Sequence, residues 1–301
     1  MVKHYKINRL NDVFFKSLMG DKNRKEITLS FLNAVLKEDS DDIFVDVSFS
    51  EQEIEPTMEG GKAPRLDIVA VLNDGTQVDI EVQVNNQDFI VERSLMYWSR
   101  LYSNQMVSGD DYDSLKKVVV IDLLAFNHLT EKSWHNIAQF TIKDSHRVIT
   151  DHIQMHFLEL PKLKLKDLRR LRRIEAWGAY FSGKYSKMEL EEIIMAEPAI
   201  KRALDYEHYF TQDDALRRKY EMRQDGMRDW TTSINAAERK GEAKGIARGI
   251  TKGIKQGRQQ EKLNNAKNLL DAGISMQIIS KSLGLTIAQL EQLQHNNNHQ
   301  D

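Results

Sequence analysis

The stretch PRLDIVAVLNDGTQVDIEVQ, from Pro64 to Gln83, decides the fold of this chain. Arg65 to Leu72 form an apolar, β-branched run that contains one acid, Asp67. The next residues, Asn73-Asp74-Gly75, favour a tight turn, because Asx and Gly residues accept the positive φ angles of hairpin turns. From Gln77 to Val84 apolar and polar residues alternate, which is the period of a β-strand. The stretch therefore predicts a β-hairpin.

The hairpin carries acids in strands that are otherwise apolar. The polar residues of the return strand share one face: Gln77, Asp79, Glu81 and Gln83. Burial of an unpaired carboxylate costs several kcal/mol, so Asp67 and Glu81 need a partner. A shared divalent cation is one such partner, since carboxylates and water suit Mg²⁺ or Mn²⁺. An ion pair with Lys62 or Arg65 is the other interpretation.

Length and composition fit one buried domain with an appendage, or two domains. The chain has 301 residues, of which 41% are hydrophobic and 29% charged, values typical of a folded globular protein. It has no apolar run of about 18 residues, so no membrane span is expected. The first residues, MVKHYKINRLND, lack the apolar core of a signal peptide, and the chain has no Cys. We expect a cytoplasmic protein.

Positive charge is concentrated in two segments, although the net charge is −2. Residues 161–173, PKLKLKDLRRLRR, carry seven Lys or Arg against one Asp. Residues 238–262 carry eight basic residues against three acidic ones. Each segment is either a solvated helix face or a surface that contacts phosphate groups.

Periodicity predicts a mixed α/β sheet with helices on its faces in the first part of the chain. Helices are expected from residue 8 or 11 to 19, over 23–36 and over 87–107. Besides the hairpin, strands are expected over 43–54, 115–124, 137–142 and 152–160. This is the order α, β, hairpin, α, β.

After Pro161 the chain is expected to be all-helical, with helices over 165–180, 187–197 and 199–220, the last of which extends towards Trp230. Gly then recurs every four residues from Gly241 to Gly257, and three Ile residues each follow a Gly. Each interior Gly costs a helix about 1 kcal/mol relative to Ala. This repeat is therefore either a flexible linker or a helix that a partner helix stabilises by close packing. Two helix breaks, at Gly273 and Gly284, predict a small helical module at the end.

The hairpin resembles the active-site signature of the PD-(D/E)XK nuclease superfamily, in which an Asp is followed after a turn by Glu-x-Lys or Glu-x-Gln. The chain is most similar to its Rpn family of recombination-promoting nucleases, also labelled putative transposases. The likeness extends in order through NDVFFKSLMGDKNRKEITLSFLNAVL (11–36), RSLMYWSRLYSNQMVSGDDYDSLKKVVVIDLL (93–124) and HFLELPKLK (156–164). It covers roughly the first 180 residues.

This resemblance implies a restriction-endonuclease-like core and a metal centre. Asp67 and Glu81 would hold a divalent metal, with the backbone carbonyl of Val82 as third ligand. Mg²⁺ is expected, and Mn²⁺ or Ca²⁺ are alternatives. Gln83 stands where many members carry Lys, so its neutral amide can orient water or phosphate but adds no charge. Asp12, which precedes Phe15-Lys16 as in the family, is a further candidate catalytic residue.

The sequence thus predicts four segments: a nuclease domain over 1–180, a helical extension over 181–235, the Gly repeat over 236–262 and a helical module over 263–295. The expected function is that of a metal-dependent DNA endonuclease associated with recombination or mobile elements. The alternative is a catalytically weak nuclease fold that binds DNA or protein. The expected partners are DNA and, through the Gly repeat, a second copy of the chain.

Overall fold

The computed structural model describes residues 7–38, 40–50, 67–86, 88–165 and 167–297. The chain divides into two compact units, Met1–Asp225 and Gly226–Asp301. Among the described residues, no helix is long and apolar enough to cross a membrane.

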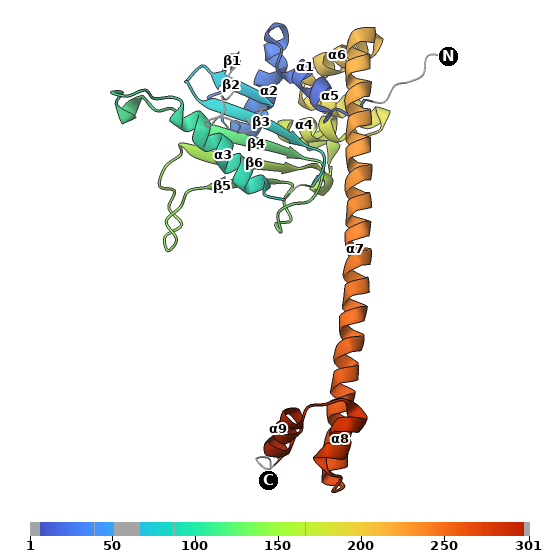
Figure 1. The fold of residues 1–301 in the computed structure, drawn as a ribbon. Coiled ribbons are helices and arrows are strands. Elements are labelled where there is room, and N and C mark those ends of the chain that lie inside the picture. The colour runs from blue at the N-terminus through green and yellow to red at the C-terminus, as the bar shows by residue number, and fades with distance from the viewer. Residues whose placement is uncertain (1–6, 39, 51–66, 87, 166, 298–301) are drawn as a thin grey trace. The chain divides into compact units, whose positions relative to one another are not determined.

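A six-stranded sheet forms the centre of the first unit, with strand order β1-β2-β3-β4-β6-β5 (Figure 1). The strands are β1 Val47–Ser50, β2 Ile68–Leu72, β3 Gln77–Gln83, β4 Val118–Leu124, β5 His135–Gln139 and β6 Ile153–Glu159. Strands β3, β4 and β6 run parallel, whereas β1, β2 and β5 complete the sheet through antiparallel pairs. The predicted mixed sheet is confirmed.

The predicted hairpin is β2–β3. Gly75 has a φ of 87°, in the left-handed region that Gly enters without strain. The Gly75 N–H donates to the Leu72 carbonyl over 2.9 Å, and the Asp74 carboxylate accepts from the Thr76 N–H over 2.8 Å. These bonds close the turn and set the register that places Val69 opposite Asp79.

Helices lie on both faces of the sheet (Figure 1). Those of the first unit are α1 Asp12–Met19, α2 Lys25–Leu36, α3 Ile90–Ser103, α4 Arg173–Ser182, α5 Lys187–Ala196 and α6 Ala199–Gln212, with the short turns η1 Lys22–Arg24, η2 Tyr112–Ser114, η3 Leu160–Lys162 and η4 Leu168–Arg170. Helix α3 packs on β3 and β4, and its Ile90 joins Val120 and Leu124 of β4 in a small apolar cluster. The opposite face of the sheet belongs to the main core with α1, α2 and α4.

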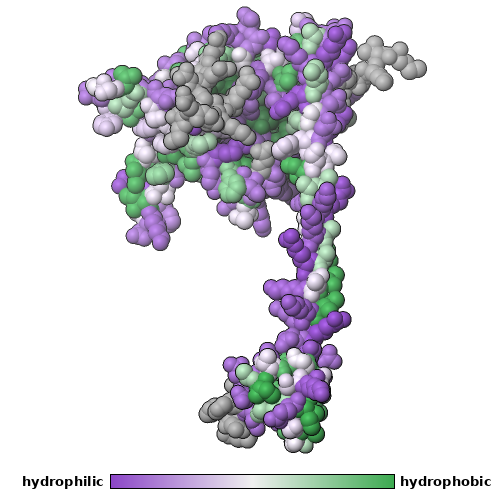
Figure 2. Space-filling view, in the orientation of Figure 1, coloured by the Kyte–Doolittle hydropathy of each residue, from purple (hydrophilic) through white to green (hydrophobic). Residues whose placement is uncertain are grey.

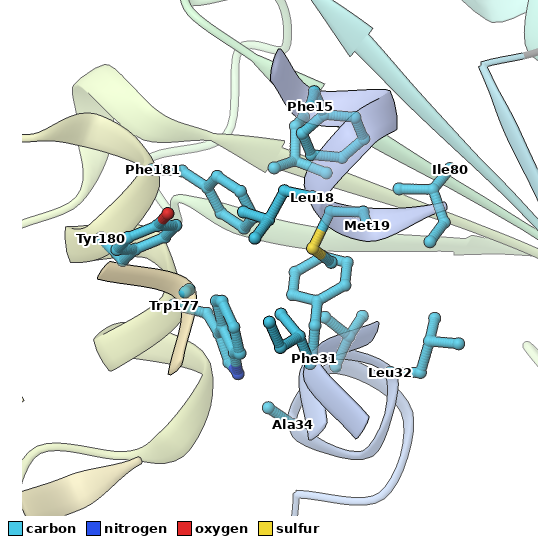
Figure 3. Packing of buried hydrophobic residues seen from close by; sticks show 14 of the residues in the cluster. Phe15, Leu18, Met19, Phe31, Leu32, Ala34, Ile80, Trp177, Tyr180 and Phe181 are labelled. Atoms are coloured by element: carbon cyan, nitrogen blue, oxygen red, sulfur yellow. The ribbon is translucent and has the colours of Figure 1, made fainter. Parts of the chain in front are cut away.

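The main core is aromatic where α1, α2 and α4 meet (Figure 3). Phe31 of α2 packs edge-on against Trp177 and Phe181 of α4, with ring centroids 5.8 Å and 5.6 Å apart. Ile80 of β3 is fully buried in the same core. One face of β3 is therefore anchored by apolar packing, which leaves its other face to the acidic residues.

The helix predicted over 165–180 is partly wrong, because α4 begins only at Arg173. The residues before it form η4, whose N-terminus Asp167 caps by accepting from the Arg169 N–H. A continuous helix would place Arg169 and Arg170 one turn from Arg173, and like charges at that spacing destabilise a helix.

Helix α7, Asp214–Asp271, begins in the first unit and ends in the second. It contains the whole Gly repeat, so these residues are helical, and stabilisation by a partner helix stays a prediction. The second unit ends with α8 Met276–Leu283 and α9 Ile287–Asn297, which bury Ile279 and Leu290 against the end of α7. Gly273 and Gly284 take positive φ angles of 80° and 65° at the predicted helix breaks.

Candidate active site

Asp67 and Glu81 are joined by two hydrogen bonds that cross between the strands of the hairpin. The Asp67 N–H donates to Glu81 Oε1 over 2.9 Å, and the Val82 N–H donates to Asp67 Oδ2 over 3.0 Å. Each carboxylate thus has one oxygen held by the backbone. The other oxygen of each is left to other partners, and the two side chains are fixed side by side.

Two further acids lie on the same face of the sheet, under α3. Asp79 and Glu81 alternate along β3, and the parallel register places Asp122 of β4 beside Glu81. Asp79, Glu81 and Asp122 are 0%, 3% and 1% exposed. Asp122 accepts a 2.8 Å bond from Ser94 of α3, whereas neither carboxylate oxygen of Asp79 has a partner among the described residues.

Burial raises the pKa of Asp79, Glu81 and Asp122, and neighbouring carboxylates add to the shift at Asp79 and Glu81. Burial and then the Asp67 charge raise the pKa of Glu81 to about 8. Burial raises the pKa of Asp122 to about 7, although the Ser94 bond and Arg93 oppose the shift. Burial, Glu81 and Asp122 raise the pKa of Asp79 well above its usual value. The cluster is therefore a place where negative charge is costly unless a cation neutralises it.

Cationic and amide groups approach the two bridged carboxylates from different elements. Lys16 of α1 places its Nζ 3.0 Å from Asp67 Oδ1, and its side chain is 36% exposed. Gln83 donates a long, 3.4 Å bond from its Nε2 to Glu81 Oε2. Asp67 Oδ1 and Glu81 Oε2 are therefore contacted by the side chains of Lys16 and Gln83. A ligand could displace either side chain.

The structure brings Asp67, Glu81 and Gln83 together, as the hairpin predicted, and places Val82, which the family resemblance added, beside them, but it places Asp12 differently. Asp12 of α1 forms an ion pair with Arg223 of α7, with its oxygens 2.8 Å and 2.9 Å from Arg223 Nε. The alternative partners of Asp67, Lys62 and Arg65, lie outside the described residues.

Sequence reasoning did not single out Asp79, Asp122 or the Lys16–Asp67 pair. Asp122 had a usable signal, because it is the one acid in the apolar run VVVIDLL of β4. Asp79 had the weaker signal of sharing a strand face with Glu81. The Lys16 contact joins residues 51 positions apart in sequence, and no local pattern reveals it.

The donor set fits a hard divalent cation better than a soft one. Both backbone polar groups of a strand residue point to the same side, so the Val82 carbonyl faces the β2 side of β3, as its N–H does. Within the described ranges, no three His or acidic side chains cluster as metal ligands. A site here would thus have two carboxylates, one carbonyl and water, a set typical of Mg²⁺ or Mn²⁺.

Comparison with known proteins agrees with this geometry. Residues 9–237 match the profile of the PD-(D/E)XK nuclease family transposases, and this range contains the whole sheet and every residue of the acidic cluster. No curated protein and no solved structure shows a significant match to the chain. Since the matched range covers most of its length, this chain belongs to the PD-(D/E)XK nuclease family transposases.

Proposed function

We propose that this protein is a metal-dependent DNA endonuclease that acts in recombination or in the movement of mobile elements. The observation that carries the proposal is the pair of crossed hydrogen bonds that holds Asp67 beside Glu81. These bonds hold Asp67 beside the buried Glu81, where burial and the Asp67 charge raise the pKa of Glu81, an arrangement that a bound cation would relieve.

In this proposal, Asp67, Glu81 and the Val82 carbonyl hold a Mg²⁺ ion. When bound, such an ion polarises the phosphoryl oxygen and lowers the pKa of a bound water. The carboxylates of Asp67 and Glu81 are already in place for such an ion, because the Val82 N–H holds one oxygen of Asp67 and the Asp67 N–H holds one oxygen of Glu81. Asp122, held by Ser94, and the buried Asp79 lie beside the pair with raised pKa values, so a bound cation would favour their ionised forms.

Lys16 supplies the positive charge that Gln83 lacks. Its ammonium lies 3.0 Å from Asp67 and is partly exposed, so it can turn from the carboxylate to a scissile phosphate. Gln83, whose amide contacts Glu81, orients the attacking water by hydrogen bonds alone. A fixed cation aimed at developing phosphate charge contributes to transition-state stabilisation, which a neutral amide does only weakly.

The neutral Gln83 also supports the second candidate function, a catalytically weak nuclease fold that binds DNA or protein. The two proposals are separated by incubating supercoiled plasmid with the purified full-length chain in Mg²⁺, Mn²⁺ or EDTA. An endonuclease converts the plasmid to nicked and linear forms in Mg²⁺ or Mn²⁺ only, and Glu81→Gln removes this activity. An intact plasmid under all conditions, together with retained DNA binding, would establish the second function.

A parallel incubation with single-stranded RNA tests the substrate class. The DNA endonuclease proposal expects the plasmid to be cut at protein concentrations that leave the RNA intact. Faster cleavage of the RNA in the same buffer would move the substrate from DNA to RNA.

We further propose that the Gly repeat of α7 mediates self-association. Ile246, Ile250 and Ile254 are 57%, 58% and 53% exposed, and they form an apolar stripe among the basic residues and glycines of the repeat (Figure 2). At the repeat glycines from Gly241 to Gly257, a Cβ atom would meet nothing within 4 Å. Without side chains there, the backbones of two such helices can approach closely and bury the isoleucines.

A further inference from the structure

A basic cavity of about 560 Å³ lies where η3 and η4 meet the segment that leads into β5. Trp134 and Leu171 form part of its apolar wall. Five cationic side chains line it, against the two carboxylates of Asp167 and Glu175: Lys132, Lys162, Lys164, Arg170 and Arg172. The acidic cluster under α3 contributes no residue to this cavity.

Two of the five cations are already committed to the fold. Lys162 donates to Glu159 and to two backbone carbonyls over 2.6–2.8 Å. Arg172 lies 3.2 Å from both Glu38 and Glu175. Lys162 and Arg172 therefore line the cavity with positive charges that neighbouring carboxylates already compensate.

The other three cations, Lys132, Lys164 and Arg170, are exposed and make no ion pair within the part of the chain that the structure describes. Trp134, also in the wall, is only 8% exposed and gives the cavity a rigid apolar side. The cavity therefore presents uncompensated positive charge, which favours an anion with several acceptor oxygens.

The topology puts the cavity on the same edge of the sheet as Asp67 and Glu81. Strands β3, β4 and β6 are parallel, so their carboxyl ends share one edge. Glu81 lies near the end of β3, whereas η3 directly follows β6, and β5 begins beside the end of β6. Neighbouring strands are about 4.8 Å apart, so β3 is roughly 10 Å from β6 and 14 Å from β5.

We propose that this basic cavity is a second phosphate-binding site, which holds the DNA backbone a few nucleotides from the phosphate at Asp67 and Glu81. The spacing of roughly 10–14 Å along the edge is a few times the axial rise of about 3.4 Å per step, so both sites can contact one duplex. The inference rests on the proposed function for the identity of the polymer. Contacts of this kind position a duplex without reading its sequence.

The test compares two double variants of the full-length chain with the same change in net charge. Lys164→Gln/Arg170→Gln removes two free cations of the cavity. Lys143→Gln/Arg147→Gln removes two exposed cations from the β5–β6 turn, at the opposite edge of the sheet. Fluorescence anisotropy of a fluorescein-labelled 20-base-pair duplex gives the Kd of each protein between 50 and 200 mM KCl in Ca²⁺, and two unrelated duplex sequences are used.

The cavity variant should bind both duplexes about tenfold more weakly. Its slope of log K against log salt should fall by about 1.8, because each neutralised phosphate contributes about 0.9. The control should stay within about twofold of wild type. Equal losses in the two variants would overturn the cavity as a site, even if the wild type cleaves plasmid.

Two further arms separate the remaining outcomes. Inorganic phosphate at 10 mM, added at constant ionic strength, should leave duplex binding nearly unchanged. Displacement by phosphate in wild type but not in the cavity variant would reassign the cavity to a small anion. If the cavity variant loses duplex binding as expected but the wild type never cuts plasmid in Mg²⁺ or Mn²⁺, the second site stands and the proposed endonuclease function fails.

Discussion

Burial and the neighbouring Asp67 carboxylate both raise the pKa of Glu81. Its pKa rises from 4.5 to about 8 in the folded chain, so it holds a proton at neutral pH while the unfolded chain does not. The unfolded state loses its proton first, near pH 4.5. The free energy of unfolding contributed by Glu81 therefore falls as the pH rises from about 4.5 to about 8.

A divalent cation bound at Glu81 should offset this loss of stability at high pH. Binding displaces the proton, so affinity rises with pH up to about 8. We expect Mg²⁺ to raise the thermal midpoint more at pH 8 than at pH 6, as measured by calorimetry. Glu81→Gln should raise the midpoint in EDTA at pH 8, because the neutral amide replaces a repelled charge, and should abolish the response to Mg²⁺. An equal response to Mg²⁺ in the variant would place the ion elsewhere.

The charge that acts on the scissile phosphate is assigned to Lys16, and this assignment has its own test. Lys16→Gln should lower the rate of plasmid cleavage by about 100–1,000-fold, since one positioned donor to developing charge contributes on that order. Adding Gln83→Lys should restore a large part of the rate, because it returns a positive charge to the carboxylate pair, next to Glu81. Gln83→Ala alone should lower the rate.

The thermal midpoint of the Lys16→Gln variant serves as the control for folding. It should stay within a few degrees of the wild-type value, since Lys16 is partly exposed. A rate that falls with Lys16→Gln but is not recovered by Gln83→Lys would mean that Lys16 positions Asp67 and does not meet phosphate.

Among the elements, the β5–β6 pair carries a histidine pair that predicts acid lability. His135 Nε2 lies 2.9 Å from His156 Nδ1, a bond that needs at least one neutral ring. Burial, with a contribution from Arg172, lowers the pKa of His135 to about 4. Burial and then His135 lower the pKa of His156 to about 3. Above about pH 6.5 both rings are neutral in the folded and in the unfolded chain. As the pH falls below 6.5, the unfolded chain takes up protons before the folded chain does.

The free energy of unfolding should therefore fall as the pH drops from about 6.5 towards 4, by up to about 1.4 kcal/mol per pH unit for each ring. His135→Leu/His156→Leu removes both partners together and leaves neither bond half-made. Its urea unfolding curve should depend less steeply on pH in this window than that of the wild type. His208→Gln, on the exposed side of α6, is the control and should keep the wild-type slope. Identical slopes in all three proteins would contradict the assignment.

The elements show what local sequence determines and what it does not. Strand β3 and the turn at Gly75 were predicted almost to the residue, because alternation and turn chemistry are local. The start of α4 at Arg173 was missed, since charge repulsion and the cap at Asp167 override the helical composition of that segment. The Gly repeat was left open between helix and linker, because Gly content alone argues against the helix that the structure has.

At the scale of the whole molecule, the proposed self-association predicts a concentration-dependent mass. Full-length protein at tens of micromolar should elute as a dimer or larger species by light scattering, and a chain ending at Asn235 should be monomeric yet still cut plasmid. Ile250→Glu should also give a monomer, because it places a charge in the apolar stripe. Ile234→Glu, at a 46% exposed position of α7 outside the repeat, should not. A monomeric mass for the full-length chain at tens of micromolar would contradict the proposed self-association.

Several residues of the candidate site come together only through the tertiary fold. The hairpin pattern indicated Asp67, Glu81 and Gln83, because these residues lie within one supersecondary motif, and the family resemblance added the Val82 carbonyl. Asp122 enters through the parallel pairing of β3 with β4, and Lys16 enters from α1. Neither long-range contact leaves a periodic signal in the sequence. The same limit explains Asp12, whose ion pair with Arg223 links residues 211 positions apart.

The central claim is that Asp67, Glu81 and the Val82 carbonyl hold one divalent cation. Anomalous scattering from a crystal of the full-length protein soaked in Mn²⁺ tests it most directly. The account predicts one strong peak at about 2.0–2.3 Å from a carboxylate oxygen of each acid and from the Val82 oxygen, with Lys16 displaced from Asp67. A peak elsewhere, or none while Lys16 remains paired with Asp67, would contradict it.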